Sequence, residues 1–295
     1  MFTGFKLEID ENKFIEQFVE SNQTFEHYRC IGENHLNEQK AQIKEDLSKY
    51  VVEGGVIDGT SLENNWFPQV DADIFISHSH GDKEVVQALA GWIFEKFDVK
   101  CFIDSCVWGY IDKLLENLNS KYSNKRVTSD GALYSHEKCN IAASHVNMML
   151  NISLQKMIDR TETMILINTP NSIKKYDGNE ESTFSPWIYS EIVCSQIINK
   201  KKLNEYRKGS QIEISMNEQF QDNSELILKY NVSLEHLIDL KCDDLIKWKQ
   251  AWDKYKSVNK YALDQLYKIK NPTIFKNISD SDDKLISKKE DIFIY

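Results

Sequence analysis

Residues 73–104 read DIFISHSHGDKEVVQALAGWIFEKFDVKCFID and decide the fold. A short apolar run at 73–77 precedes a segment whose apolar side chains recur at spacings of three and four residues. They are Val85, Leu89, Trp92, Ile93 and Phe97. A second apolar run, 99–104, follows directly, and this succession of strand, helix and strand is typical of a parallel sheet. We predict strands at 73–77 and 99–104, joined by an amphipathic helix that Asp82 caps.

Three further segments complete the predicted sheet. The run TMILIN at 163–168 is a third buried strand, and a mostly apolar helix at about 141–159 precedes it. A polar loop, SNKRVTSDGALYSHEKCN, lies before that helix. Weaker strand signals occur at 211–214 (QIEI) and 236–240 (HLIDL). The sequence therefore predicts an α/β fold with a five-stranded parallel sheet flanked by helices.

The two ends of the chain differ from this pattern. Residues 1–66 are charged, with apolar positions at helical spacing: Phe14, Phe18 and Val19, and then Ile43, Leu47 and Tyr50. The turn-rich run EGGVIDGTSLENNWFP ends this segment. Beyond residue 243, apolar positions again recur at helical spacing. We predict a helical N-terminal extension at 1–69, an α/β domain at 70–242 and a helical C-terminal tail at 243–295.

Composition excludes several classes of function. The chain has 295 residues, of which 41% are hydrophobic, which is enough for a sizeable core. A formal net charge of −10 opposes attraction to a phosphate backbone, so we expect no nucleic-acid partner. Six cysteines form no CxxC pair, and no signal peptide or long apolar span is present. We therefore expect a cytoplasmic protein with reduced thiols and no membrane contact.

Polar and aromatic side chains follow the first two predicted strands. Ser77, His78 and Ser79 come at the end of the first strand, and three further candidates come after the second: Asp104, Trp108 and Tyr110. In an open parallel sheet, ligands bind beyond the carboxyl ends of the strands. We therefore predict that these six residues bind a ligand at that edge. The alternatives are a turn that satisfies its own backbone for the three residues after the first strand, and ordinary core packing for Trp108, and the sequence allows them equally.

Glu191 is the candidate catalytic residue. Ser185 and Pro186 form a typical helix start, and Trp187 and Glu191 then lie one turn apart on one face of the helix. Cys194 and Ile198 continue this face, so Glu191 is a carboxylate on an otherwise apolar line. The alternative is a structural carboxylate that caps a loop or pairs with an arginine, which the spacing allows equally.

Other candidates rest on weaker patterns. His145 interrupts an apolar line on the helix at 141–159 and is a candidate binding residue, although an ordinary core histidine gives the same pattern. Cys101, Cys106, His136 and Cys139 match no common zinc spacing. Neither GxGxxG nor GxxxxGK occurs, so we expect no metal and no tightly held cofactor.

Three motifs carry a family resemblance. DIFISHSHGDKE, the strand FIDS followed by CVWGY, and SPWIYSE resemble bacterial TIR (Toll/interleukin-1 receptor) domains over about residues 70–242. The resemblance implies a flavodoxin-like TIR fold and an enzyme that cleaves the nicotinamide-ribose bond of NAD. It places the family's catalytic glutamate, in a Trp-x-x-x-Glu pattern, at Glu191. NAD is then a substrate, with Trp187 lining the pocket and Trp108 or Tyr110 stacking on a flat ring.

The stretches FIDSCVWGY and SHVNMML resemble a bacterial subgroup associated with anti-phage defence, including Thoeris-type TIR subunits. This implies an NAD glycohydrolase or cyclase that depletes NAD or makes an ADP-ribose-derived signal in bacterial immunity. It also implies homo-oligomers through TIR–TIR contacts, and either a phage-derived trigger or an effector protein that senses the product. The chain departs from a minimal TIR domain in its helical ends and in an insertion of about 30 residues after the second strand. The alternative function is a non-enzymatic TIR adaptor that acts by assembly.

Overall fold

The centre of the molecule is a five-stranded parallel sheet of order β10-β1-β6-β2-β3. The computed structural model describes residues 1–20, 23–40, 47–51, 56–108, 111–128, 131–176, 180–206, 229–257 and 260–272. The strands are β1 (Thr3–Leu7), β2 (Ile74–Ser77), β3 (Cys101–Phe102), β6 (Thr163–Ile167) and β10 (Ile238–Leu240). The α/β class and the five-stranded parallel sheet predicted from the sequence are thus confirmed.

The N-terminal segment corrects one element of the sequence prediction. Residues 3–7 are an interior strand, and Phe5 lies opposite Ile165 on one side and Ile238 on the other. The prediction of a purely helical extension was therefore wrong at this point. The strand is short and interrupted by Gly4 and Lys6, so its apolar pattern alone does not identify it. The predicted strand at 211–214 lies outside the described residues.

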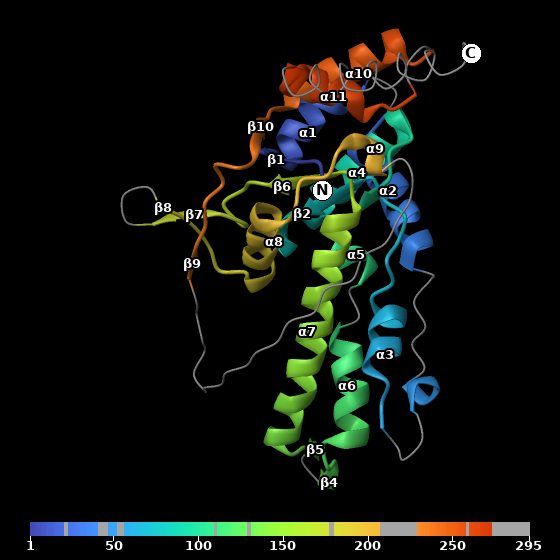
Figure 1. Cartoon of the computed structure of the whole chain (residues 1–295), viewed down its shortest axis with the longest axis vertical. Coiled ribbons are helices and arrows are strands. Elements are labelled where there is room, and N and C mark those ends of the chain that lie inside the picture. Colours follow the sequence, from blue (N-terminus) through green and yellow to red (C-terminus); the bar gives the residue numbers. More distant parts are fainter. Residues whose placement is uncertain are drawn as a thin grey trace, which may run out of the picture.

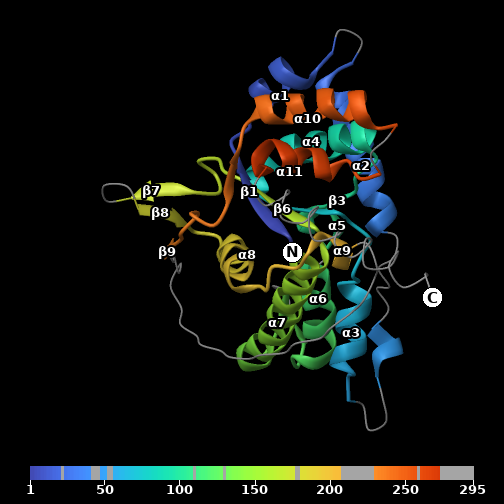
Figure 2. The ribbon, with the colours of Figure 1, turned by 45° about the horizontal axis from the view of Figure 1, so that its top comes forward.

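Helices cover both faces of the sheet (Figures 1 and 2). On one face lie α1 (Glu11–Phe18), α2 (Phe25–Lys40), α4 (Lys83–Phe97), α10 (Cys242–Tyr255) and α11 (Leu263–Lys270). On the other lie α7 (His136–Arg160) and α8 (Pro186–Ile197). The predicted helices at 85–97, at 141–159, after Pro186 and in the C-terminal tail are confirmed. The lysines at 200–202 would suit a helix C-terminus and predict that the helix after Pro186 runs to them, but α8 ends at Ile197. Both sheet faces are buried, as a parallel sheet requires.

The helices predicted before residue 66 are confirmed only in part. Phe14 and Phe18 of α1 are buried as their spacing predicts. Residues 41–46, which include Ile43, lie outside the described residues, and Leu47–Tyr50 form a single turn of 3₁₀ helix, η1. The long helix of this region is α2, which has a weaker apolar pattern than α1.

Helices α2 and α4 pack with their backbones almost in contact. A Cβ atom added at Gly91 would lie 1.9 Å from the carbonyl oxygen of Tyr28, and one added at Gly32 would lie 2.0 Å from that of Gln87. Cβ atoms do not approach a backbone oxygen that closely, so only glycine fits at either position. These two residues therefore set how close α2 lies to α4.

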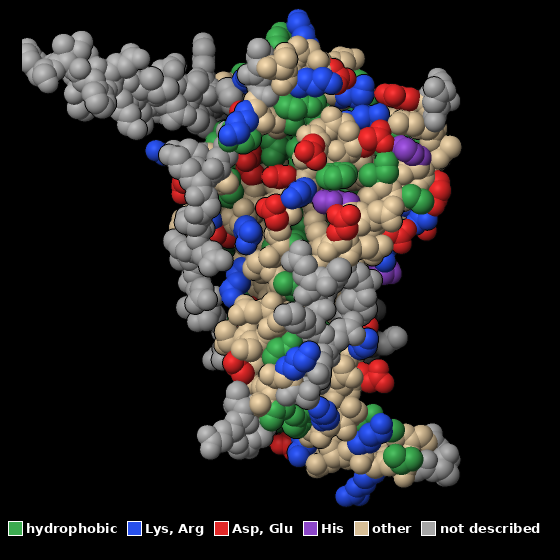
Figure 3. Space-filling view, turned by 90° about the vertical axis from the view of Figure 1, so that its right-hand side faces the viewer, with side chains coloured by type: hydrophobic (Ala, Val, Ile, Leu, Met, Phe, Trp, Pro, Cys, Tyr) green, Lys and Arg blue, Asp and Glu red, His purple; other side chains and the backbone are tan. Residues whose placement is uncertain are grey.

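The segment between β3 and β6 forms an arm that extends from the sheet. It contains α5 (Asp104–Val107), α6 (Ile111–Tyr122), a hairpin of β4 (Arg126–Thr128) and β5 (Gly131–Leu133), and then α7. The predicted polar loop thus includes a hairpin. Figure 3 shows basic side chains at the end of the molecule that carries this arm. Alongside it lies α3 (Gly59–Trp66).

A small antiparallel sheet lies at the side of the molecule in Figure 1. It contains β7 (Lys174–Tyr176), β8 (Glu180–Thr183) and β9 (Tyr230–Asn231). Tyr189 of α8 stacks on Tyr230, with ring centroids 4.6 Å apart. The remaining short helices are η3 (His80–Asp82) and α9 (Leu203–Tyr206). Within the described ranges, no helix combines the length and apolar character needed to span a bilayer.

The strand order places a switch point between β2 and β6. From β2 the chain passes to β3 on one side, and from β3 it returns across β2 to β6 on the other. The order β3-β2-β6 matches the 2-1-3 arrangement of flavodoxin-like folds, and β1 fills the place that their fourth strand takes. The architecture is consistent with a flavodoxin-like fold whose ligand cleft lies beyond the carboxyl ends of β2 and β6.

Candidate active site

The carboxyl ends of β2, β3 and β6 bring residues far apart in the sequence together. Ser77, the last residue of β2, lies opposite Leu166 near the end of β6. Asp104 begins the short helix after β3, and α8 crosses the same region after β6. The predicted candidates Ser77, His78 and Asp104 therefore lie at one edge of the sheet.

Glu191 is buried against the end of β2. The Ser77 hydroxyl donates a hydrogen bond to Oε2 of Glu191 across 2.5 Å. Ser77 is fully buried and Glu191 is only 3% exposed. The start of α8 fixes this position, because Ser185 accepts a hydrogen bond from the backbone N–H of Ile188 and Pro186 follows it.

No arginine or lysine contacts Glu191 within the part of the chain that the structure describes. The alternative of a structural carboxylate paired with an arginine therefore finds no support there. The Glu191 carboxyl group is instead hydrogen-bonded to Ser77, the last residue of β2. It therefore lies at the edge of the sheet where parallel sheets bind ligands.

His78 links β2 to the segment after β3. Its Nε2 lies 2.9 Å from the hydroxyl oxygen of Ser105, and its Nδ1 lies 3.9 Å from Oδ1 of Asp104. Burial lowers the pKa of His78, while the nearby Asp104 carboxylate opposes this. The imidazole is therefore neutral at neutral pH, and its hydrogen bond to Ser105 joins the segment after β3 to the end of β2.

The environment of Glu191 favours its protonated form. Burial raises the pKa of its carboxyl group well above the usual value, and the negative charge of Asp104 adds to this. The hydrogen bond from Ser77 acts in the opposite direction. A cation bound beside Glu191 would favour the carboxylate, so occupancy of the site by a positively charged group is coupled to loss of this proton.

The raised pKa predicts how stability changes with pH. Above about pH 4.5 the unfolded chain releases the Glu191 proton while the folded chain retains it, so the free energy of unfolding falls as pH rises. The slope from one retained proton is about 1.4 kcal/mol per pH unit. We expect Glu191→Gln to remove this contribution. Thermal unfolding of the unmodified protein and of Glu191→Gln from pH 5 upward measures this contribution. If the free energies of unfolding of the two proteins changed in parallel with pH, the prediction would be contradicted.

A second polar cluster orders the loops next to this site. The Thr169 hydroxyl donates to Oδ2 of Asp82 across 2.6 Å, and the Asn171 amide donates to Oδ1 across 2.8 Å. The prediction that the Asp82 side chain caps α4 was wrong, since it makes no capping hydrogen bond. Its carboxylate joins the start of α4 to the loop after β6 instead.

The aromatic candidates lie less clearly at the site. Trp108 is buried in the core, where its ring packs edge-on against Phe67 and Phe102. Trp187 is partly buried against the same core, one turn before Glu191. Tyr110 lies outside the described residues. Within the described residues, neither tryptophan forms a hydrogen bond with Ser77 or Glu191, so their binding roles stay predictions.

The structure does not bring His145 or the Ser79 side chain into the hydrogen-bonded group. His145 is exposed on α7, because the buried face of that helix runs through Val146, Met149, Leu150 and Ser153. The buried face of α7 thus passes through Val146, one residue after the position that the predicted apolar face gave to His145. Ser79 is partly exposed at the start of η3, and its side chain makes no capping hydrogen bond.

Sequence reasoning missed two residues of this region as site candidates. Thr169 and Asn171 hold Asp82 through side-chain hydrogen bonds. Both follow the carboxyl end of β6, so their position along the chain was a usable signal. Their small polar side chains are common in loops, however, and do not stand out without the contacts.

Two pockets lie elsewhere, and Glu191 lines neither of them. Both border Thr3 and Ile238, the first residues of β1 and β10, and so lie at the opposite edge of the sheet. The described ranges hold no group of three or more His, Cys, Asp or Glu side chains arranged to bind a metal ion.

Comparison of the chain with protein-family models, with curated proteins and with solved structures finds no match. Function is therefore inferred from the residues at the carboxyl edge of the sheet.

Proposed function

We propose that this protein is a TIR-type enzyme that cleaves NAD at its nicotinamide-ribose bond, with Glu191 as the catalytic carboxylate. The observation that carries the proposal is the buried Glu191 carboxyl group, hydrogen-bonded to Ser77 at the switch point of the parallel sheet. The sequence motifs around Ser77, Asp104 and Glu191, which resemble those of bacterial TIR domains, meet at this point. The bacterial defence role and the cytoplasmic location belong to the same proposal.

The chemistry of NAD suits a single carboxylate. Nicotinamide leaves its pyridinium form as a neutral ring, so no acid is required to protonate the leaving group. The main requirement is stabilisation of positive charge that develops on the ribose. A carboxylate in a site with little water stabilises that charge more strongly than one in bulk solvent. Glu191 is placed to do this without the second carboxyl group that ordinary glycosidases use.

The protonation state of Glu191 fits a cationic substrate. Burial and Asp104 both disfavour the charge of the Glu191 carboxyl group and so favour its protonated form. The positive nicotinamide ring of NAD favours the carboxylate, so substrate binding and proton release go together. Ser77 stabilises the charged form through its hydrogen bond, and His78 is hydrogen-bonded to Ser105 beside it. Ribose hydroxyls are the groups that these polar side chains would bind.

The direct test is to incubate the full-length protein with NAD and measure release of nicotinamide. Because homo-oligomers are part of the proposal, the assay covers a wide range of protein concentrations, and mass spectrometry identifies linear or cyclic ADP-ribose products. Nicotinamide release supports the enzyme. Absence of turnover at every concentration, with retained self-association, would favour the alternative of a TIR adaptor that acts by assembly.

Replacing Ser77 tests the hydrogen bond to Glu191. We expect Ser77→Ala to move the rising limb of the activity-pH profile to higher pH, because the variant loses the donor that stabilises the carboxylate. Activity at neutral pH should fall by about tenfold. Ser144→Ala is a matched control, since the Ser144 hydroxyl bonds only to the carbonyl oxygen of Asn140 on its own helix. A uniform loss of activity without a shift in the profile would show that Ser77 does not tune Glu191.

A further inference from the structure

A pocket of about 450 Å³ opens at the amino ends of β1 and β10. Thr3 and Ile238, the first residues of these strands, line it together with Phe2 and His236. This volume lies within the range of small-molecule sites. The pocket is on the edge of the sheet opposite Glu191, so it is separate from the proposed active site.

The same pocket is lined by three consecutive lysines that follow α8, at 200–202. Lys201 pairs with Asp159, which offsets its charge. Within the described part of the chain, Lys200 and Lys202 make no ion pair, and the ammonium group of Lys200 donates to the backbone oxygen of Ser195. Burial lowers the pKa of Lys200, as expected for an ammonium group without a carboxylate partner. Two cations are thus placed together on a protein of net charge −10.

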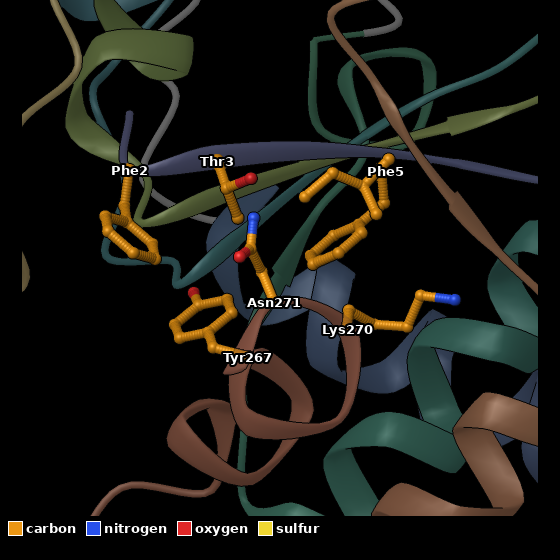
Figure 4. A pocket seen from close by; sticks show the side chains of 7 residues that line it. Phe2, Thr3, Phe5, Tyr267, Lys270 and Asn271 are labelled. Carbon is orange, nitrogen blue, oxygen red and sulfur yellow. The ribbon is translucent and has the colours of Figure 1, made fainter. Parts of the chain in front are cut away.

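An apolar recess adjoins the lysines. It shares Phe2, Thr3 and Ile238 with the larger pocket, and the buried rings of Phe5 and Tyr267 also line it. Its volume of about 50 Å³ is too small for a nucleobase, so a flat ring of a ligand would lie in the larger pocket. The ring of Phe2 packs against that of Tyr267, with centroids 4.9 Å apart, and Figure 4 shows the two rings beside each other. Phe2 is only partly buried and is therefore suited to contact such a ring.

We propose that this pocket binds a nucleoside diphosphate. Lys200 and Lys202 would bind the phosphates, as lysines bind anions through point charges, and the base would lie in the same pocket against Phe2. His236 also lines the pocket, and its Nε2 is hydrogen-bonded to the Ser195 hydroxyl oxygen at 2.7 Å. Two lysines that form no ion pair with the described residues, beside a partly exposed aromatic ring, favour a nucleotide over a simple anion.

Calorimetric titration of the full-length protein with ADP tests this site. We expect saturable binding that Lys202→Glu weakens by about tenfold, since the substitution replaces attraction to phosphate with repulsion. Lys121→Glu is the matched control, because Lys121 is an exposed lysine at the end of α6 and changes the net charge equally. Equal weakening by both variants, or absence of binding to the unmodified protein, would overturn the proposal.

Two further titrations test whether the nucleoside contributes to binding and whether ADP binds away from Glu191. Inorganic pyrophosphate should bind more weakly than ADP and compete with it; equal affinities would overturn the assignment of a nucleoside. Glu191→Gln should bind ADP as tightly as the unmodified protein, because the two sites lie at opposite edges of the sheet. A loss of ADP binding in this variant would place the ligand at Glu191 and contradict the proposed site. ADP is also a part of NAD and could occupy the proposed active site, so it is the weakening by Lys202→Glu that reports on this pocket, whether or not the protein cleaves NAD.

Discussion

Replacing Glu191 with glutamine is expected to reduce nicotinamide release from NAD by about a thousandfold. Glutamine keeps the size of the side chain and accepts the hydrogen bond from Ser77, but it cannot become negatively charged. The developing positive charge on the ribose then lacks its stabilising partner. Rates of nicotinamide release at saturating NAD measure the effect, and the loss should appear mainly in kcat, because the charge develops in the transition state.

The matched control is Glu116→Gln, which makes the same chemical change at an exposed position on α6. It should leave the rate unchanged. Glu191→Gln should also fold normally, since it replaces a buried carboxyl group that is neutral in the empty site. A folded Glu191→Gln variant with full activity would remove Glu191 from the mechanism, whatever the identity of the product.

Gly91→Ala is expected to produce the largest loss of stability. The added Cβ would lie 1.9 Å from the carbonyl oxygen of Tyr28, which belongs to the backbone of α2 and cannot turn aside. The two helices would have to separate, and overpacking of this kind costs about 3 kcal/mol. Denaturant unfolding followed by circular dichroism measures the change. The effect is large relative to the usual stability of folded domains.

Gly59→Ala is the control for this substitution. Gly59 begins α3, and a Cβ there would meet no atom within 4 Å. Alanine also favours a helix more than glycine does, so the variant should be as stable as the unmodified protein or slightly more stable. Equal stability of Gly91→Ala and Gly59→Ala would mean that α2 does not approach α4 as closely as the structure has it.

Buried elements with strong periodicity could be predicted from the sequence. The run 73–77 became β2, and the apolar line through Leu89 and Ile93 became the buried face of α4. The Ser185 and Pro186 pair gave the start of α8 because capping is a local interaction. Glu191 stood out for the same reason, since one charged residue on an apolar face can be seen from spacing alone.

Elements that depend on distant partners could not be predicted. Residues 3–7 contain only two strongly apolar side chains, Phe5 and Leu7, and form a strand because β6 and β10 pair with both of their edges. The hydrogen bond between Asp82 and Thr169 joins segments 87 positions apart, which no local pattern encodes. The sequence predicted that Ser77, His78 and Asp104 lie at one edge of the sheet, where the structure has them, but it did not reveal which polar side chains pair there.

The place of β1 in the sheet has a consequence for synthesis of the chain. Thr3 pairs with Thr163, whose hydroxyl bonds to the Thr3 carbonyl oxygen across 160 positions of sequence. Translation therefore exposes the first strand long before either of its neighbours leaves the ribosome. Until then, its two open edges can pair with other nascent chains, so β1 is a natural segment for chaperones to protect.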